Sequence, residues 1–133
     1  MAEPHQLTEL QIAIMRILWE RKEATVAEIH AALLDERGLA PTTVATLLSR
    51  LEKRGAVKHS TVSRQYVYYP LVSEADVRSS MVADLTEQLF AGDVAELVSH
   101  LLRAQDMTPG DLEKVKELIA THEAGTEVSD EHR

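Results

Sequence analysis

The chain has 133 residues, of which 44% are hydrophobic, 27% are charged and 4% are aromatic, and it contains no cysteine. This length and composition predict one compact unit, or one small domain with an appendage, and they exclude a wholly disordered chain. The lack of cysteine excludes disulfides, thiolate metal sites and a cysteine nucleophile, which fits a reducing cytoplasm, and no apolar run reaches the ~20 residues of a membrane span.

The formal net charge of −8 argues against a nucleic-acid partner only while it is taken as a total. Residues 1–72 carry nine Lys/Arg and eight Asp/Glu, a net of +1, whereas residues 73–133 carry five and fourteen, a net of −9. Within residues 37–72, six basic side chains accompany a single acid, Glu52. This asymmetry predicts two parts with different roles, divided near Pro70–Ser73.

The first two predicted helices each begin with a capping box, a threonine followed three residues later by Gln or Glu. Thr8 opens a helix whose apolar residues recur at helical spacing as far as Arg21. Thr25 opens a second helix, for which Gly38 is the expected C-cap.

The third predicted helix has the clearest period of the chain. Pro41 suits a first helical turn, and apolar residues then recur at i, i+3, i+4 and i+7: Val44, Leu47, Leu48 and Leu51. This pattern predicts a helix over Pro41–Arg54 that ends before Gly55.

After this helix the pattern changes to that of strands. Val57–Val62 and Gln65–Tyr69 are rich in Val, Thr and Tyr, and Ser63-Arg64 between them suits a tight turn, so a β-hairpin ending at Pro70 is expected. Three helices followed by a hairpin is the element order of a winged helix-turn-helix, in which the second helix of the motif enters the major groove of DNA. The predicted fold is therefore mainly α with a small β-hairpin wing.

The polar face of the third helix carries hydroxyls, a guanidinium and an ammonium group, but no carboxylate. Such groups can bind phosphates and base edges, a threonine methyl can contact a thymine methyl, and arginine can bind guanine through two hydrogen bonds. The expected DNA contacts on this helix and the hairpin are Thr42, Thr43, Thr46, Ser49, Arg50, Lys53, Arg54, Lys58 and Arg64. An ordinary solvated face, or a scaffold module with an acidic protein partner, remains open as the alternative, as does a regulator with a small-molecule pocket between the two domains.

Residues 1–72 thus form the expected winged-helix domain, and residues 73–123 are predicted to form three further helices. The first covers Ser73–Phe90, the second follows Gly92, and the third starts at Thr108-Pro109 and ends near Glu123. Residues 124–133 lack periodicity and are predicted to be a disordered tail.

Three helices of about fifty residues in all are too small to bury their own apolar side chains. Pairing with a second copy is the economical solution, and it predicts two reading helices on a pseudo-palindromic operator. Packing onto the winged helix of the same chain is the alternative. The expected interface residues are Val77, Met81, Leu85, Leu89, Phe90, Val94, Leu97, Val98, Leu101, Leu112, Val115, Leu118 and Ile119.

The sequence indicates neither an enzyme nor a cofactor. Its six histidines are scattered without metal-ligand spacing. It has no glycine-rich phosphate loop, no nucleophile elbow and no pair of catalytic acids.

Three segments resemble the penicillinase repressor family (BlaI/MecI/CopY). They are the start LTELQ at residues 7–11 together with Trp19, the run APTTVATLLSRLEKRGAV at residues 40–57, and the wing RQYVYYP at residues 64–70. The resemblance covers roughly residues 7–122. It implies a cytoplasmic, homodimeric repressor with an N-terminal winged helix and a C-terminal helical dimerisation domain.

By this resemblance, Thr43, Thr46 and Arg50 would contact bases and phosphates in the major groove, and Arg64 would reach the flanking backbone or minor groove. Some members are cut by a sensor protease at an Asn–Phe bond. Here His100-Leu101 occupies that position, so a sensor protease is a candidate partner whose known bond is not reproduced. The cysteine cluster of copper-responsive members is absent, and Ser63 stands where a glycine is frequent in the wing.

Overall fold

The computed structural model describes residues 4–131, with side chains as far as residue 125. The chain divides into two compact units, Met1–Leu85 and Thr86–Arg133, so that the boundary lies inside α4 (Glu74–Phe90). The sequence predicts the division earlier, near Pro70–Ser73. The first half of α4 instead belongs to the N-terminal unit.

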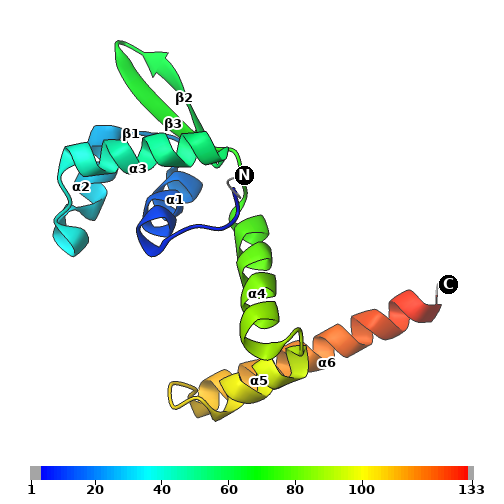
Figure 1. Ribbon diagram of the computed structural model, residues 1–133. Helices are drawn as coiled ribbons and strands as arrows, with labels where there is room; N and C mark the ends of the chain where they lie inside the picture. The colour runs from blue at the N-terminus through cyan, green and yellow to red at the C-terminus, as the bar shows by residue number, and fades with distance from the viewer. Residues whose placement is uncertain (1–3, 132–133) are drawn as a thin grey trace. The chain divides into compact units, whose positions relative to one another are not determined.

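The N-terminal unit combines three helices, a three-stranded sheet and the start of α4 (Figure 1). Its elements before α4, in chain order, are α1 (Glu9–Arg21), β1 (Ala24–Thr25), α2 (Val26–Arg37), α3 (Pro41–Arg54), β2 (Val57–Val62) and β3 (Gln65–Pro70). The three predicted helices and the hairpin are therefore confirmed. This is the winged-helix arrangement that the sequence predicts.

Both predicted capping boxes form. At α1, Thr8 Oγ1 accepts a hydrogen bond from the Gln11 backbone N–H at 3.3 Å, and the Gln11 side chain accepts from the Thr8 N–H at 3.0 Å. Thr25 and Glu28 make the same pair of bonds at α2, at 3.2 and 2.9 Å. Accepting the Thr25 N–H also lowers the pKa of Glu28, because the hydrogen bond favours the carboxylate.

The sheet has the antiparallel order β1-β3-β2. β1 is not predicted from the sequence, because two residues cannot display an alternating pattern. It pairs only with the inner part of β3, Ala24 opposite Tyr68 and Thr25 opposite Val67. The outer part of the hairpin is thus a two-stranded ribbon, which projects past α3 in Figure 1. This ribbon is the wing.

The core of the N-terminal unit lies beneath α3. Val44, Leu48 and Leu51 are fully buried and pack with Ile14 and Ile29 of the first two helices. Of the predicted apolar stripe, only Leu47 is half-buried. Because one face of α3 is committed to the core, its opposite face must point to solvent.

The C-terminal unit contains the end of α4 together with α5 (Val94–Arg103) and α6 (Pro109–Glu131). Asp93 caps α5 by accepting from the Glu96 N–H at 3.1 Å. Thr108 and Asp111 cap α6 reciprocally, at 3.0 and 3.1 Å. The starts of both helices agree with the sequence pattern.

Helix α6 is longer than expected. The sequence predicts its end near Glu123 and a disordered tail over 124–133, whereas the backbone is helical as far as Glu131. Residues 132–133 lie outside the described part of the chain. The lack of an apolar period after Glu123 does not end the helix. No proline follows Pro109 in α6, so every later residue keeps a backbone N–H that can donate to the i−4 carbonyl.

Replacing Leu48 by alanine tests the core beneath α3. The variant should lose about 2–5 kcal/mol of unfolding free energy, because the cavity adds to the lost transfer free energy. Urea unfolding followed by fluorescence of Trp19, the single tryptophan of the chain, measures this loss. Leu34→Ala is the matched control, since Leu34 is 49% exposed; an equal loss in both variants would contradict the packing described.

Candidate nucleic-acid interface

The outward face of α3 gathers most of the polar residues singled out in the sequence. Thr42, Thr43, Thr46 and Arg50 are exposed, and together with Leu47 they line a hollow of about 280 Å³. Four predicted contact residues are thus brought to one place on one helix. The hollow joins hydroxyls, methyl groups, a leucine side chain and a guanidinium, so it offers both polar and apolar recognition.

The hydroxyl of Thr46 is already engaged by its own helix. Thr46 Oγ1 donates to the backbone oxygen of Thr42 at 2.9 Å, the i−4 bond that threonine often makes within helices. Since the hydroxyl has one proton, what Thr46 can present to a ligand is its oxygen lone pairs and its methyl group.

The remaining predicted contacts on α3 have two different settings. Ser49 and Lys53 are exposed. Arg54 is half-buried, and its guanidinium donates to the backbone oxygen of Gln6, so it ties the segment before α1 to the end of α3. This structural role of Arg54 is not visible in the sequence, because the two residues lie 48 positions apart.

The wing carries two exposed basic residues, Lys58 on β2 and Arg64 in the turn. Ser63 and Arg64 both have positive φ, 49° and 67°, as a type I′ hairpin turn requires. The turn therefore forms without the glycine that is frequent in the family.

A further cluster, which the sequence does not predict, links α3 to the wing. His59 Nδ1 lies 2.7 and 2.9 Å from the two carboxylate oxygens of Glu52. The His59 ring stacks on Tyr66 with centroids 4.0 Å apart, and Tyr68 lies 5.4 Å away. The pKa of Tyr68 is raised, mainly because the side chain is buried and secondly because the Glu52 carboxylate is nearby. The only signal in the sequence is that Glu52 is a lone acid in a basic segment.

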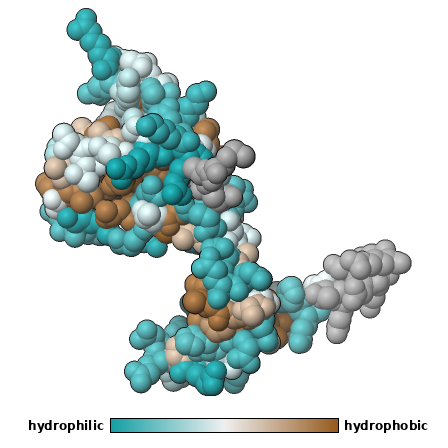
Figure 2. All heavy atoms as spheres, viewed as in Figure 1, coloured by the Kyte–Doolittle hydropathy of each residue, from teal (hydrophilic) through white to brown (hydrophobic). Residues whose placement is uncertain are grey.

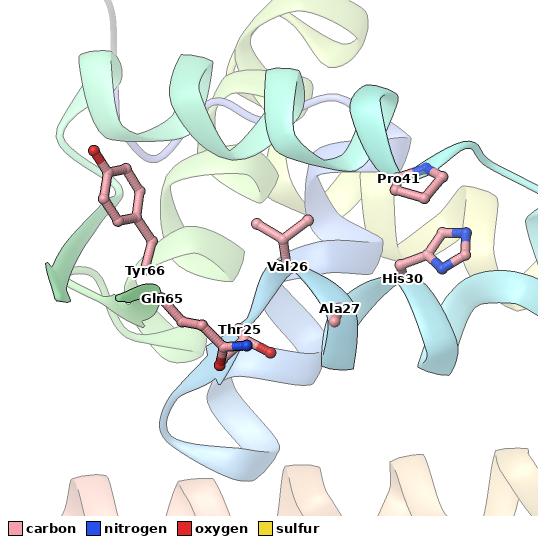
Figure 3. Close-up of a pocket in the computed structure, with 7 residues that line it drawn as sticks. All are labelled: Thr25, Val26, Ala27, His30, Pro41, Gln65 and Tyr66. Carbon is pink, nitrogen blue, oxygen red and sulfur yellow. The ribbon is translucent and has the colours of Figure 1, made fainter. Parts of the chain in front are cut away.

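A second hollow, of about 390 Å³, lies where α2, the first residue of α3 and β3 meet (Figure 3). Its lining is Thr25, Val26, Ala27, His30, Pro41, Gln65 and Tyr66. Figure 3 shows Tyr66 at one end of this group and His30 with Pro41 at the other. The alternative left open by the sequence has a small-molecule pocket between the two domains, whereas this hollow lies within the N-terminal unit.

The residues predicted for a dimer interface fall into three settings. Val77 is 3% exposed and belongs to the core of the N-terminal unit, against which Met81 also packs. Val77 is therefore not available to a partner, which corrects the sequence interpretation: α4 buries this turn within its own chain. Half-buried positions are Phe90, Leu97 and Val115. The exposed positions are Leu85, Leu89, Val94, Val98, Leu101, Leu112, Leu118 and Ile119.

The C-terminal unit leaves much apolar surface uncovered. In α5, which is described in full, no side chain is buried. Leu89 is 71% exposed and Leu118 68%. Figure 2 shows hydrophobic residues, in brown, at the surface of this unit.

The bond between His100 and Leu101 lies inside α5. The His100 ring makes an edge-on contact with Phe90, with centroids 5.9 Å apart. The main chain here is helical, not extended.

Helices α2 and α3, the exposed hydroxyl and basic face of α3 and the wing define a winged helix-turn-helix protein of the DNA-binding class. The sequence matches the penicillinase repressor family over residues 7–121, and the chain belongs to that family. It is a DNA-binding transcriptional repressor. None of the helices in the described part of the chain is long and apolar enough to cross a membrane.

Individual relatives agree with this assignment. The methicillin resistance regulatory protein MecI of Mammaliicoccus sciuri is 23% identical over 115 residues, covering 86% of this chain and 94% of its own. The transcriptional regulator BlaI of Mycobacterium tuberculosis is 36% identical over 89 residues, covering 66% of this chain and 64% of its own. The solution structure of the DNA-binding domain of the repressor BlaI superposes with a TM-score of 0.51 at 29% identity, covering 57% of this chain and 93% of that one.

The engaged hydroxyl of Thr46 leads to a test with two substitutions. Thr46→Val keeps a branched side chain and its methyl group but removes the oxygen, whereas Thr46→Ser removes the methyl and keeps the hydroxyl. If the methyl group makes the contact, Thr46→Val should bind DNA about as tightly as the parent, and Thr46→Ser should bind more weakly. Both affinities are measured by fluorescence anisotropy with a duplex that the parent protein selects from a random-sequence library. The reverse order would mean that the oxygen makes the contact.

Proposed function

We propose that this chain is a homodimeric repressor that binds a pseudo-palindromic operator. In this proposal α3 lies in the major groove, and the wing contacts the flanking backbone through Lys58 and Arg64. This proposal is supported chiefly by the division of α3 into two faces. One face is fully buried at Val44, Leu48 and Leu51, and the other exposes hydroxyls and basic groups without a carboxylate.

The distribution of charge supports this orientation. Residues 37–72 hold six basic side chains and one acid, although the chain as a whole carries −8. Neutralised phosphates release counterions, so affinity should fall steeply as salt is raised. The acidic C-terminal half would repel DNA from surfaces other than α3 and the wing.

Arg50 is the residue best suited to distinguish bases. It is exposed, it lies one helical turn after Thr46, and its planar guanidinium can bind the O6 and N7 atoms of guanine together. The threonines at the start of α3 would contact phosphates and thymine methyls. Lys53 would add attraction to the backbone.

The proposed dimer rests on the apolar surface of the C-terminal unit. A three-helix unit of this size leaves a large fraction of its surface exposed when alone. The half-exposed leucines, valines and isoleucine of α4, α5 and α6 are the natural contact with an identical unit related by a two-fold axis. A dimer also places two copies of α3 on one operator, which raises affinity through effective concentration.

A ligand-responsive regulator is the second candidate, and the hollow lined by His30 and Tyr66 favours it. Its apolar walls and few polar groups are typical of small-molecule sites. This candidate predicts a shift in DNA affinity when a small molecule is added, whereas a protein-binding scaffold predicts no salt-sensitive DNA binding at all. A sensor protease would be revealed by cleavage at His100–Leu101 in the intact cell.

Arg50→Ala should weaken binding to the selected duplex by about 1–3 kcal/mol and relax the preference at one base pair. Arg16→Ala is the matched control, because it removes the same charge from an exposed position on α1. Anisotropy titrations at equal salt give both affinities. Equal losses in the two variants would mean that only total charge matters, and no loss at Arg50 would contradict the assignment of α3.

Leu118→Glu should shift the protein from dimer to monomer, because it buries a carboxylate in the proposed apolar contact. Leu71→Glu makes the same change at a residue of the N-terminal unit that is 53% exposed, and it should remain dimeric. Sedimentation velocity measures the mass of each. A parent that is monomeric at micromolar concentration, or a Leu118→Glu variant that stays dimeric, would contradict the proposed interface.

A further inference from the structure

We propose that Glu52 and His59 form a brace that sets the angle of the wing relative to α3, and that this brace positions Arg64 for DNA binding. The inference rests on the proposed DNA-binding role of α3 and the wing. It assigns Glu52 and His59 as positioning residues that act through the wing and do not themselves contact DNA.

The brace joins two elements that the chain connects through a glycine. Glu52 lies in the last turn of α3, Gly55 follows with a left-handed φ of 86°, and His59 is the third residue of β2. Both oxygens of Glu52 lie within 2.9 Å of His59 Nδ1. Because a carboxylate can only accept, Nδ1 carries the proton and donates it to Glu52. The two side chains are 31% and 28% exposed, so solvent screens this contact only in part.

Aromatic contacts anchor the brace to the core and extend it along the wing. His59 is paired across the strands with Tyr68, which is 5% exposed and belongs to the core. The His59 ring also stacks on Tyr66, at an interplanar angle of 18°. Tyr66 lies two residues from Arg64 in the turn. The contacts therefore run from the core through His59 toward the basic tip of the wing.

The wing needs such an anchor because its outer half has few others. β1 pairs with β3 only at Val67 and Tyr68, so residues 60–66 are held in the sheet by the β2–β3 pairing alone. An isolated two-stranded ribbon is marginally stable and twists readily. The hydrogen bond from His59 to Glu52 and the ring stack on Tyr66 lie where the sheet narrows to this ribbon.

The negative charge of Glu52 allows a positioning role to be distinguished from a purely electrostatic effect. It is the only acid within residues 37–72, in the segment proposed to approach a polyanion. Simple electrostatics says that removing this carboxylate should strengthen DNA binding, because one source of repulsion is lost. A brace predicts the opposite sign, because the wing loses its orientation.

The experiment compares Glu52→Ala, Glu52→Gln and Glu20→Ala in the full-length chain by anisotropy with the selected duplex over a range of salt. Glu20 is an exposed acid on α1 and controls for loss of one negative charge. Glu52→Ala should weaken binding several-fold and lower the salt slope by about 1, as expected when one phosphate contact is lost. Glu52→Gln should bind at least as tightly as the parent, because its amide oxygen still accepts from Nδ1–H and the negative charge is gone.

A double-mutant cycle with Arg64→Ala tests whether the effect passes through the wing. If the brace acts by positioning Arg64, Glu52→Ala should have little further effect once Arg64 is gone, and the two losses should not add. Additive losses, or a Glu52→Ala variant that binds as tightly as the parent or more tightly, would overturn the brace.

A DNA-independent measurement separates the brace from the proposed function. In the free protein, ¹⁵N relaxation of residues 60–66 should show greater mobility in Glu52→Ala than in the parent or in Glu52→Gln. His59→Phe, which keeps a ring on Tyr66 but loses the hydrogen bond, gives the same comparison if Glu52→Ala does not fold. Unchanged mobility would overturn the brace, whereas a parent that binds no duplex in a salt-sensitive manner would instead overturn the proposed function.

Discussion

One face of α3 is buried in the core of the N-terminal unit, and this burial fixes which residues the helix exposes. Val44, Leu48 and Leu51 have no accessible surface, and they share a core with α1, α2 and the inner sheet. Because α3 cannot rotate without exposing these side chains, the residues on its far side are fixed toward solvent. In the proposed DNA-binding mode, the side chains that read the bases would thus be directed by packing of the core before DNA is bound.

The same constraint explains how much of the molecule can be predicted from its sequence. The bounds of α3 follow from a proline at one end, a glycine at the other and an unbroken apolar period between them. The capping boxes at Thr8 and Thr25 fix the starts of α1 and α2 for the same reason: their signals are local. The residues of α3 that are proposed to contact DNA also follow from the period, because they occupy the face opposite the buried apolar residues.

What the sequence does not predict depends on contacts between distant residues. Strand β1 exists only because Ala24 and Thr25 pair with β3, and Arg54 binds the backbone of Gln6, far away along the chain. Val77 has the spacing of an interface residue, but tertiary packing places it in the core of its own unit. Glu52 is conspicuous in the sequence as a lone acid, yet its partner His59 is found only when α3 and β2 are folded together.

DNA is proposed to contact the chain at the outward face of α3 and at the wing. An NMR titration of ¹⁵N-labelled protein with the duplex selected from a random-sequence library tests this contact surface. The amide signals of residues 42–53 and 58–65 should shift, while those of α1 and α6 should change little. Shifts confined to the C-terminal unit, with α3 unaffected although the duplex is bound, would contradict the proposed contact surface.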